Sequence, residues 1–209
     1  MGRERVVVEG QRHGRRWGTA PRHDTLSRMR IVAGQHRSRR LAVPPGKGVR
    51  PTSDRAREAI FSSLGAMVVE ARVLDLFAGS GAMGLEALSR GAAQCLFVER
   101  DAQALAAIKT NITELGERER STVDKANALT ALKRLVEAGE TFDLIVVDPP
   151  YESVPKLAGT LADLLPQALA PDGRVVLETA VNDGFDVPGL VERYNRRIAA
   201  AQIVILGAT

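Results

Sequence analysis

The chain has 209 residues, 44% of them apolar, which is enough for one domain with a hydrophobic core and a small appendage. No apolar run approaches the roughly 18 residues that a membrane-spanning helix needs, and the chain opens with Met1-Gly-Arg-Glu-Arg5 rather than the apolar stretch of a secretory signal. The single cysteine, Cys95, excludes an internal disulfide and favours a reducing compartment, so we expect a cytoplasmic protein with no membrane partner.

The positive charge is concentrated at the amino-terminal end. Residues 1–50 hold 13 of the 29 Lys and Arg residues but only 3 of the 25 acids, a net charge of +10. Residues 51–209 hold 16 basic and 22 acidic residues, a net charge of −6. Basic side chains that contact phosphates release counterions, so this asymmetry favours a polyanionic partner. Residues 1–28 combine high charge with low hydrophobicity, and we predict a disordered extension there.

Residues 29–70 form a second segment of different character. Residues 30–50 predict two short strands about a basic turn that contains Arg37, Arg39 and Arg40, ended by Pro44 to Gly48. A helix should follow from Thr52 or Ser53, whose hydroxyl suits the N-cap. Its apolar positions have helical spacing, at Ala56, Ala59, Ile60 and Leu64. The three histidines lie before or within this segment without an acid cluster, so we expect no metal site.

From residue 71 to 209, strand and helix patterns alternate, which predicts an α/β domain with a parallel sheet. Strands are predicted at about 73–77, 95–99, 120–124, 142–147, 173–178, 190–197 and 201–206. Helices are predicted at about 82–90, 102–115, 129–138 and 155–169. The last two strands have no room for a helix between them, so they should form a hairpin with an antiparallel member.

A glycine-rich turn follows the first strand of this region. Gly79-Ser-Gly81-Ala-Met-Gly84 matches the pattern G-x-G-x-x-G between a strand and a helix, as in a nucleotide-cofactor loop. Glycine allows positive φ and lets a ligand lie against bare backbone. The pattern alone fits several cofactors, so the neighbouring residues have to distinguish them.

Two acids at the ends of consecutive strands narrow the choice. Asp75 ends the first strand, where a carboxylate repels the pyrophosphate of a dinucleotide and attracts the ammonium or sulfonium of S-adenosylmethionine. Glu99 ends the second strand, where it can accept hydrogen bonds from both ribose hydroxyls. Both cofactors contain ribose, so Glu99 alone does not discriminate. The two acids together favour S-adenosylmethionine.

The tetrapeptide Asp148-Pro149-Pro150-Tyr151 follows the nearly continuous apolar run 142–147. The carboxyl ends of strands in an open α/β sheet face one crevice, so it should lie beside the glycine loop. The exocyclic amine of a base is a poor nucleophile because its lone pair is delocalised into the ring. Asp148 and the Pro149 carbonyl can each accept one of its N–H groups, which would aim the lone pair at an electrophilic methyl group. The prolines hold these acceptors rigidly, and Tyr151 offers a ring for base stacking.

These motifs resemble known enzymes. Val73-Leu-Asp-Leu-Phe-Ala-Gly-Ser-Gly81 with Asp148–Tyr151 resembles the class I S-adenosylmethionine-dependent N-methyltransferases. Arg50-Pro-Thr-Ser-Asp-Arg-Ala-Arg-Glu58, preceded by Arg30-Ile-Val-Ala-Gly34, is similar to the bacterial (RsmD-like) family that methylates guanine N2 in 16S ribosomal RNA. The resemblance runs from Met29 to about Leu206. It implies a Rossmann-like α/β fold with a seven-stranded, mostly parallel sheet whose last strand is antiparallel.

The resemblance also implies roles for individual residues. The cofactor-binding set would be Asp75, Phe77, Gly79, Ser80, Gly81, Glu99, Arg100, Asn127 and Ala128, with the last two beside the adenine. The target guanine would be held by the catalytic tetrapeptide Asp148, Pro149, Pro150 and Tyr151, with residues 50–54 closing over the site. RNA would be bound by Arg37, Arg39, Arg40 and Arg50.

We therefore predict a monomeric S-adenosylmethionine-dependent rRNA (guanine-N2-)-methyltransferase that acts on 16S rRNA of the small ribosomal subunit and uses no metal. Two other functions stay open. The same tetrapeptide can serve adenine N6 in DNA or RNA, and a non-catalytic RNA-binding protein can keep this fold. A nucleotide-dependent oxidoreductase is disfavoured by Asp75 and the tetrapeptide.

Overall fold

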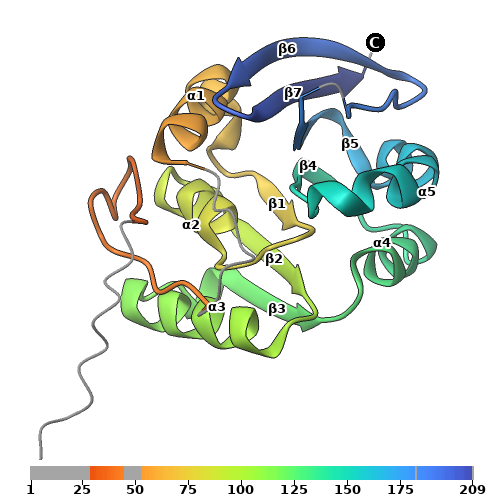
Figure 1. Ribbon diagram of the computed structural model, residues 1–209. Coiled ribbons are helices and arrows are strands. Elements are labelled where there is room, and N and C mark those ends of the chain that lie inside the picture. The colour runs from red at the N-terminus through yellow and green to blue at the C-terminus, as the bar shows by residue number, and fades with distance from the viewer. Residues whose placement is uncertain (1–28, 45–52, 182, 209) are drawn as a thin grey trace, which may run out of the picture.

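A computed structural model describes residues 29–44, 53–181 and 183–208, and its centre is a seven-stranded sheet (Figure 1). The strand order is β3-β2-β1-β4-β5-β7-β6. Only β7 is antiparallel to its neighbours β5 and β6, so the predicted α/β class, the mostly parallel sheet and its antiparallel last strand are confirmed. The bounds are β1 (Arg72–Asp75), β2 (Gln94–Glu99), β3 (Ser121–Lys125), β4 (Phe142–Val147), β5 (Leu169–Ala180), β6 (Leu190–Ile198) and β7 (Ala201–Ala208).

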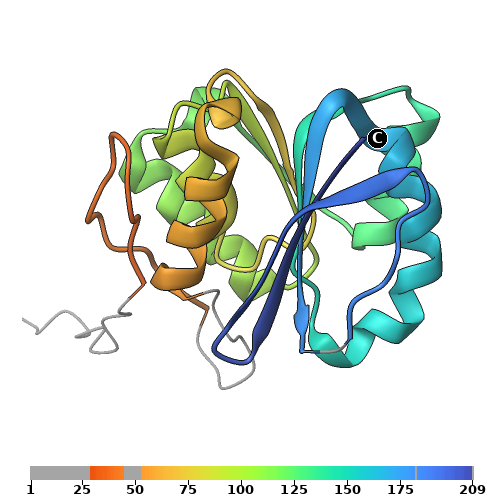
Figure 2. The same cartoon turned by 90° about the horizontal axis from the view of Figure 1, so that it is seen from above.

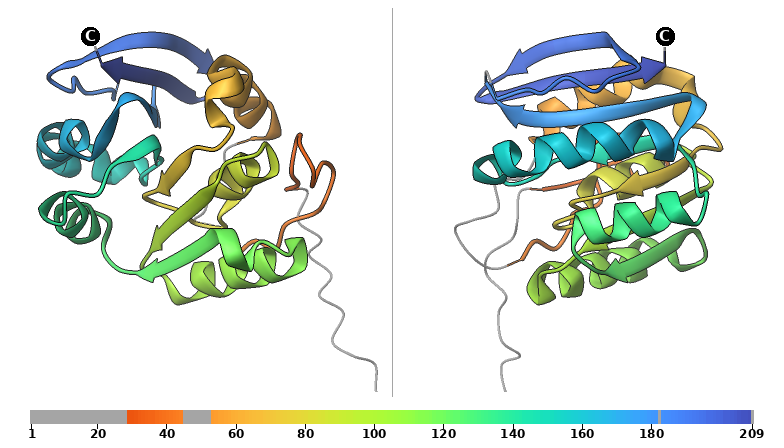
Figure 3. Two further views of the ribbon diagram at one scale, coloured as in Figure 1. Left: turned by 180° about the vertical axis from the view of Figure 1, so that it is seen from behind. Right: turned by 90° about the vertical axis from the view of Figure 1, so that its right-hand side faces the viewer.

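Helices cover both faces of the sheet, as Figures 1 and 3 show. One face carries α1 (Asp54–Leu64), α2 (Ala82–Ser89) and α3 (Ala102–Leu115), and the other carries α4 (Ala128–Glu137) and α5 (Val154–Ala168). The described part of the chain also forms three short 3-10 helices, η1 (Gly65–Val68), η2 (Arg118–Arg120) and η3 (Tyr151–Ser153). No helix of the described residues is both long and apolar enough to cross a membrane.

The local signals explain most of these boundaries. Ser53 caps α1 by accepting a hydrogen bond from the Ala56 amide at 3.1 Å, and Gly91 follows α2 with φ of 102°, as a stop signal requires. The helix predicted at residues 102–115 is observed with the same bounds, as α3. β5 starts at Leu169 rather than near residue 173, because Phe142 pairs with Leu169 and the next pair joins Leu144 to Arg174. The residues of β5 between these two pairs leave the ladder as a bulge.

The predicted pair of strands in residues 30–50 is replaced by a looser hairpin. Its ladder is one isolated bridge between Arg30 and Arg40, flanked by backbone bonds such as Ile31 N–H to Arg39 C=O at 2.9 Å. The amides of Val32 and Ala33 instead donate to the buried carboxylate of Glu86 on α2, at 2.7 and 3.0 Å. The hairpin is therefore held against α2, and part of its backbone is satisfied by a side chain instead of a strand.

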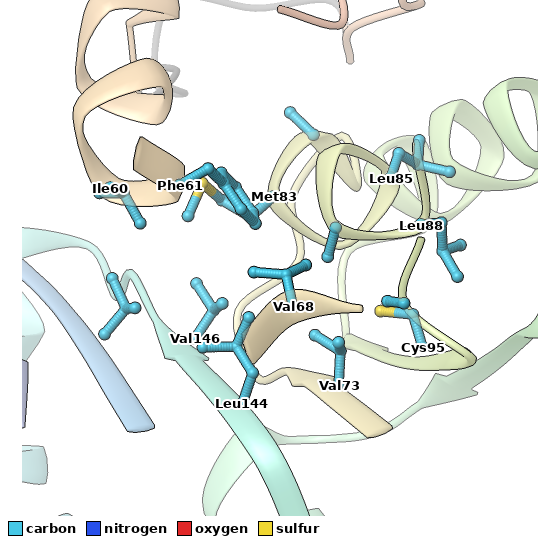
Figure 4. Packing of buried hydrophobic residues seen from close by; sticks show 14 of the residues in the cluster. Ile60, Phe61, Val68, Val73, Met83, Leu85, Leu88, Cys95, Leu144 and Val146 are labelled. Carbon is cyan, nitrogen blue, oxygen red and sulfur yellow. The ribbon is translucent and has the colours of Figure 1, made fainter. Parts of the chain in front are cut away.

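Two apolar clusters lie on the two faces of the sheet. Figure 4 shows the first, in which Phe61 of α1, Met83 of α2 and Val146 of β4 pack together. Met29, Ile31 and other residues of the amino-terminal segment belong to this same cluster. Residues 144 to 147 alternate between the two clusters, as expected of a strand buried on both faces. The amino-terminal segment therefore shares the core of the sheet.

Candidate active site

The glycine loop at the carboxyl end of β1 has the geometry that its sequence predicts. Gly79 and Gly81 have φ of 53° and 79°, values that favour glycine, and Gly81 caps α2 in a left-handed conformation. A Cβ added to Gly79 would meet no atom within 4 Å. A Cβ added to Gly84 would lie 2.4 Å from the Phe97 ring, so the third glycine serves the packing of α2 on β2. Gly79 thus faces open space against which a ligand can lie.

Glu99 joins the end of β2 to this loop. Its half-buried carboxylate accepts hydrogen bonds from the amides of Gly79, Arg100 and Asp101 at 2.8, 2.7 and 2.9 Å. The structure therefore brings Glu99 and the glycine loop together. The Arg100 side chain is exposed, and Phe77 packs on the second apolar cluster. Arg100 therefore contacts this site through its backbone amide, which donates to Glu99.

Asp75 lies beneath the loop rather than at its surface. The side chain is 2% exposed, and Oδ2 accepts a hydrogen bond from the Gly84 amide at 3.0 Å. Burial raises the pKa of Asp75 to about 7, the Gly84 amide opposes this shift, and the charge of Glu99 adds to it. Asp75 therefore anchors the start of α2. Direct contact between its carboxylate and a cationic ligand stays a prediction.

The raised pKa of Asp75 gives stability a pH dependence. The folded protein keeps this proton up to about pH 7, whereas the unfolded chain loses it near 3.8, so the stabilisation is present at low pH and lost as pH rises. We expect the unfolding free energy of the native chain relative to Asp75→Asn to fall by up to about 1.4 kcal/mol per pH unit between about pH 5 and 7, then level off. Urea unfolding across this range measures it.

The exposed Asp163 on α5 offers a control for this titration. Asp163→Asn should leave the slope of stability with pH as it is in the native chain. Asparagine at position 75 can still accept the Gly84 amide, so the variant should fold. A difference between the native chain and Asp75→Asn that does not change with pH would contradict the raised pKa.

The other predicted cofactor residues follow β3. Asn127 is exposed and caps α4, because its Oδ1 accepts the amides of Leu129 and Thr130 at 3.0 and 3.3 Å. Ala128 is buried, and the neighbouring Ala126 amide donates to the Glu99 carbonyl at 3.1 Å. Asn127 therefore lies near Glu99. Its oxygen is used by the helix, so the group it can offer a ligand is the Nδ2 donor.

The tetrapeptide Asp148–Tyr151 continues β4, the strand beside β1. Asp75 pairs with Val146, and the Leu76 amide donates to the Val146 carbonyl at 3.0 Å, so Asp148 lies just beyond the end of β1. Asp148 and Tyr151 are half-buried, Pro149 is buried and Pro150 is exposed. The Pro150 carbonyl accepts the Ser153 amide at 2.8 Å as η3 begins. The tetrapeptide and the glycine loop therefore occupy the same edge of the sheet.

Sequence patterns did not identify a buried asparagine that ties the amino-terminal segment to this edge. Asn111 of α3 is fully buried; its Nδ2 donates to the carbonyls of Ser80 and Ala42, both at 2.9 Å, and its Oδ1 accepts the Ala42 amide at 2.7 Å. The Ser80 hydroxyl donates to the Met29 sulfur at 3.2 Å. One sequence signal could have identified it: Asn111 occupies an apolar-face position of an amphipathic helix, where a buried polar side chain needs hydrogen-bond partners.

A second buried polar residue, Arg57 of α1, also escaped prediction. One guanidinium nitrogen donates to the Arg30 carbonyl at 2.7 Å and to Asp54 Oδ1 at 2.6 Å. Burial lowers the pKa of Arg57, and the negative charges of Asp54, Glu86 and Glu178 oppose that shift. Arg57 sits at a helical spacing that otherwise indicates a core position, but its charge made an exposed site the default expectation.

The predicted RNA-binding arginines are spread along the α2–α3 face. Arg37, Arg39 and Arg40 are exposed. The turn next to Arg37 contacts the carboxyl end of α2, where the Gln35 amide donates to the Ser89 carbonyl at 2.8 Å. Arg40 pairs with Arg30 near the open end of the hairpin. The structure therefore places Arg37 away from the glycine loop and Arg40 nearer to it; Arg50 lies outside the described residues, as do residues 1–28.

Comparisons with known proteins agree with this architecture. The family described as "Conserved hypothetical protein 95" matches residues 29–207. The ribosomal RNA small subunit methyltransferase D of Escherichia coli K12 is 35% identical over 182 residues, covering 86% of this chain and 89% of that protein. YlbH of Bacillus subtilis 168 is 40% identical over 151 residues, covering 72% of this chain and 82% of that protein. The solved structure of yhhF from Escherichia coli superposes with a TM-score of 0.76 at 33% identity, covering 87% and 99% of the two chains.

Proposed function

Because the chain belongs to the family of the ribosomal RNA small subunit methyltransferase D proteins, we propose that it methylates the N2 amine of a guanine in 16S ribosomal RNA, with S-adenosylmethionine as the methyl donor. The observation that carries this proposal is the position of Asp148–Tyr151 on the strand beside the glycine loop. Donor and acceptor sites at one edge of a sheet allow direct transfer between them. Such a substrate would place the enzyme in the cytoplasm.

The residues at this edge fit S-adenosylmethionine. When bound, the cofactor supplies a methyl group on a sulfonium, an electrophile that needs no further activation by the protein. Open space over Gly79 accommodates a ligand against bare backbone. In this proposal Glu99, which accepts the Gly79 amide, would also accept from the ribose, and the Asn127 Nδ2 would donate to an adenine nitrogen. Burial raises the pKa of Asp75 to about 7, and a bound cation nearby would favour its charged form, although its own hydrogen bond goes to Gly84.

Asp148 and Pro149 would orient the acceptor. The Asp148 carboxylate and the Pro149 carbonyl accept the two N–H groups of the guanine amine, which directs its lone pair towards the methyl group. Pro149 is buried and Pro150 has φ of −54°, so the backbone that carries these acceptors is stiff. Tyr151 would stack on the base. The protein thus contributes mainly orientation. The N–C bond would form as the bond between the donor sulfur and its methyl group breaks, and the amine would release one proton to water or to Asp148 during or after the transfer.

We propose that Arg37, Arg39 and Arg40 bind RNA phosphates, together with Arg50. Because Arg37 and Arg40 lie at different distances from the glycine loop, the RNA would extend along the α2–α3 face. Arg39 already donates to the Glu114 carbonyl at 2.8 Å, which holds part of its guanidinium against α3. A substrate of this extent is a structured RNA rather than a nucleotide.

A comparison of substrates tests the function. Purified protein with labelled S-adenosylmethionine should methylate 16S rRNA or small subunits from cells that lack the enzyme, and mass spectrometry should identify N2-methylguanine. Methyl groups on adenine N6, or on DNA, would support the alternative acceptor instead. Absence of S-adenosylmethionine binding by calorimetry would favour a non-catalytic RNA-binding protein.

A further inference from the structure

We propose that Arg196 and Arg197, at the end of the β6–β7 hairpin, form a second RNA contact that binds phosphates flanking the target nucleotide. This inference rests on the proposed function and concerns a surface far from the basic amino-terminal segment in sequence. The hairpin would hold the RNA on the β5 side of the acceptor site, while Arg37, Arg39 and Arg40 hold it along α2 and α3.

The strand register places these two arginines at the carboxyl edge. Arg197 pairs with Gln202 of β7, and Gln202 pairs with Thr179 near the end of β5. β5 in turn pairs with β4, where Val147 is opposite Leu177, so Thr179 is near the level of Pro149. Three strand spacings of about 4.8 Å separate β6 from β4, a distance of about 14 Å. Figure 2 shows the hairpin turn on the same side of the molecule as the end of β5.

The two side chains project from opposite faces of the hairpin. Tyr194 and Ile198 pack against the cluster beneath α1, and strand alternation puts Arg196 on their side and Arg197 on the other. Both arginines are exposed. The Arg197 Nε donates to the Ala199 carbonyl at 3.2 Å, which holds its guanidinium at the turn, and Arg196 forms no ion pair with any residue that the structure describes. An RNA strand that crosses the turn can contact both.

The charge of this hairpin differs from that of its surroundings. Residues 51–209 carry a net charge of −6, yet β6 holds three arginines and one acid within Leu190–Ile198. Charges on an edge strand also prevent edge-to-edge aggregation, but that role does not require them at the acceptor edge. Arg193 serves as the comparison, because it lies on the same strand away from the turn and donates to the Ala208 carbonyl at 2.6 Å.

The test compares two double variants that remove the same charge. Arg196→Gln with Arg197→Gln neutralises the end of the hairpin, and Arg193→Gln with Lys133→Gln neutralises two exposed residues elsewhere. Binding to protein-free 16S rRNA is measured between about 50 and 200 mM salt. The first variant should bind about 10- to 50-fold more weakly at 0.1 M salt, and its salt slope should fall by about 1.4–1.8. The second should bind nearly as the native chain does, and both should bind S-adenosylmethionine normally.

Three results would overturn the inference. The hairpin variant could bind rRNA as the native chain does, or the control variant could lose as much affinity, which would indicate a general effect of net charge. A defect seen with small subunits but not with protein-free rRNA would assign the arginines to a ribosomal protein. The binding assay does not depend on catalysis, so failure of the native chain to methylate rRNA would count against the proposed function alone.

Discussion

Asp148→Ala is expected to lower the turnover number for methyl transfer by about 10²- to 10⁴-fold. The change removes the carboxylate that accepts one N–H group of the target amine, so the lone pair is no longer directed at the methyl group. Affinity for S-adenosylmethionine should change by less than about threefold, because Asp148 lies beyond the end of β4 and the glycine loop is held by Glu99 and Asp75. Single-turnover transfer on 16S rRNA and calorimetric cofactor binding measure the two effects.

Asp163→Ala provides the matched control for this variant. Asp163 is an exposed aspartate on α5, so its removal should alter neither transfer nor binding. Near-normal turnover of Asp148→Ala on its RNA would show that another group orients the amine. A loss of cofactor affinity equal to the loss of turnover would assign Asp148 to the donor side of the site.

Glu99→Gln should weaken S-adenosylmethionine binding by about 10- to 100-fold. The glutamate accepts three backbone amides, one of them from Gly79, and a charged acceptor strengthens each such hydrogen bond. Glutamine keeps the shape but replaces one acceptor oxygen with a donor, which opposes either an amide of the loop or a ribose hydroxyl. We expect turnover at saturating cofactor to stay within about tenfold of normal, because the acceptor residues are unchanged.

Glu137→Gln is the control for the loss of this charge. Glu137 is exposed at the end of α4, 3.8 Å from Lys133, where an ion pair contributes little. The affinity of the Glu137→Gln variant for S-adenosylmethionine should equal that of the native chain in the same calorimetric titration. Unchanged affinity of Glu99→Gln would remove Glu99 from the proposed ribose contact and leave it a structural role at the loop.

The fold followed from local signals to a large degree. Apolar runs, Ser53 as a cap and Gly91 as a stop place most elements within a few residues of their observed bounds. The hairpin of residues 30–41 is where local pattern failed, because its backbone bonds to the Glu86 carboxylate of a helix that is distant in sequence. When backbone amides bond to a side chain that is distant in sequence, the segment that carries them shows no strand periodicity of its own.

The arrangement of the candidate site residues could be predicted where a residue's place at a strand end sets its position, but not where burial sets it. Glu99 ends β2, and Gly79 and Asp148 lie just beyond β1 and β4; parallel strands bring such ends together. The burial of Asp75 depends on the close packing of α2 on β2 at Gly84. The spacing of residues in the sequence does not predict this packing. Asn111 likewise acquires its partners only when α3 lies against both the glycine loop and Ala42.

The bonds of Asn111 have a thermodynamic consequence. One amide group fastens the backbone of Ala42 and that of Ser80, so the two segments share a single set of positions. A ligand that limits the motion of the glycine loop would therefore also limit the motion of the chain at Ala42, just beyond Arg39 and Arg40. Linkage is reciprocal, so if the proposed RNA contacts immobilise the hairpin of residues 30–41, they would favour the same position of the glycine loop to the same extent. If donor and acceptor bind as proposed, this asparagine would couple their binding free energies.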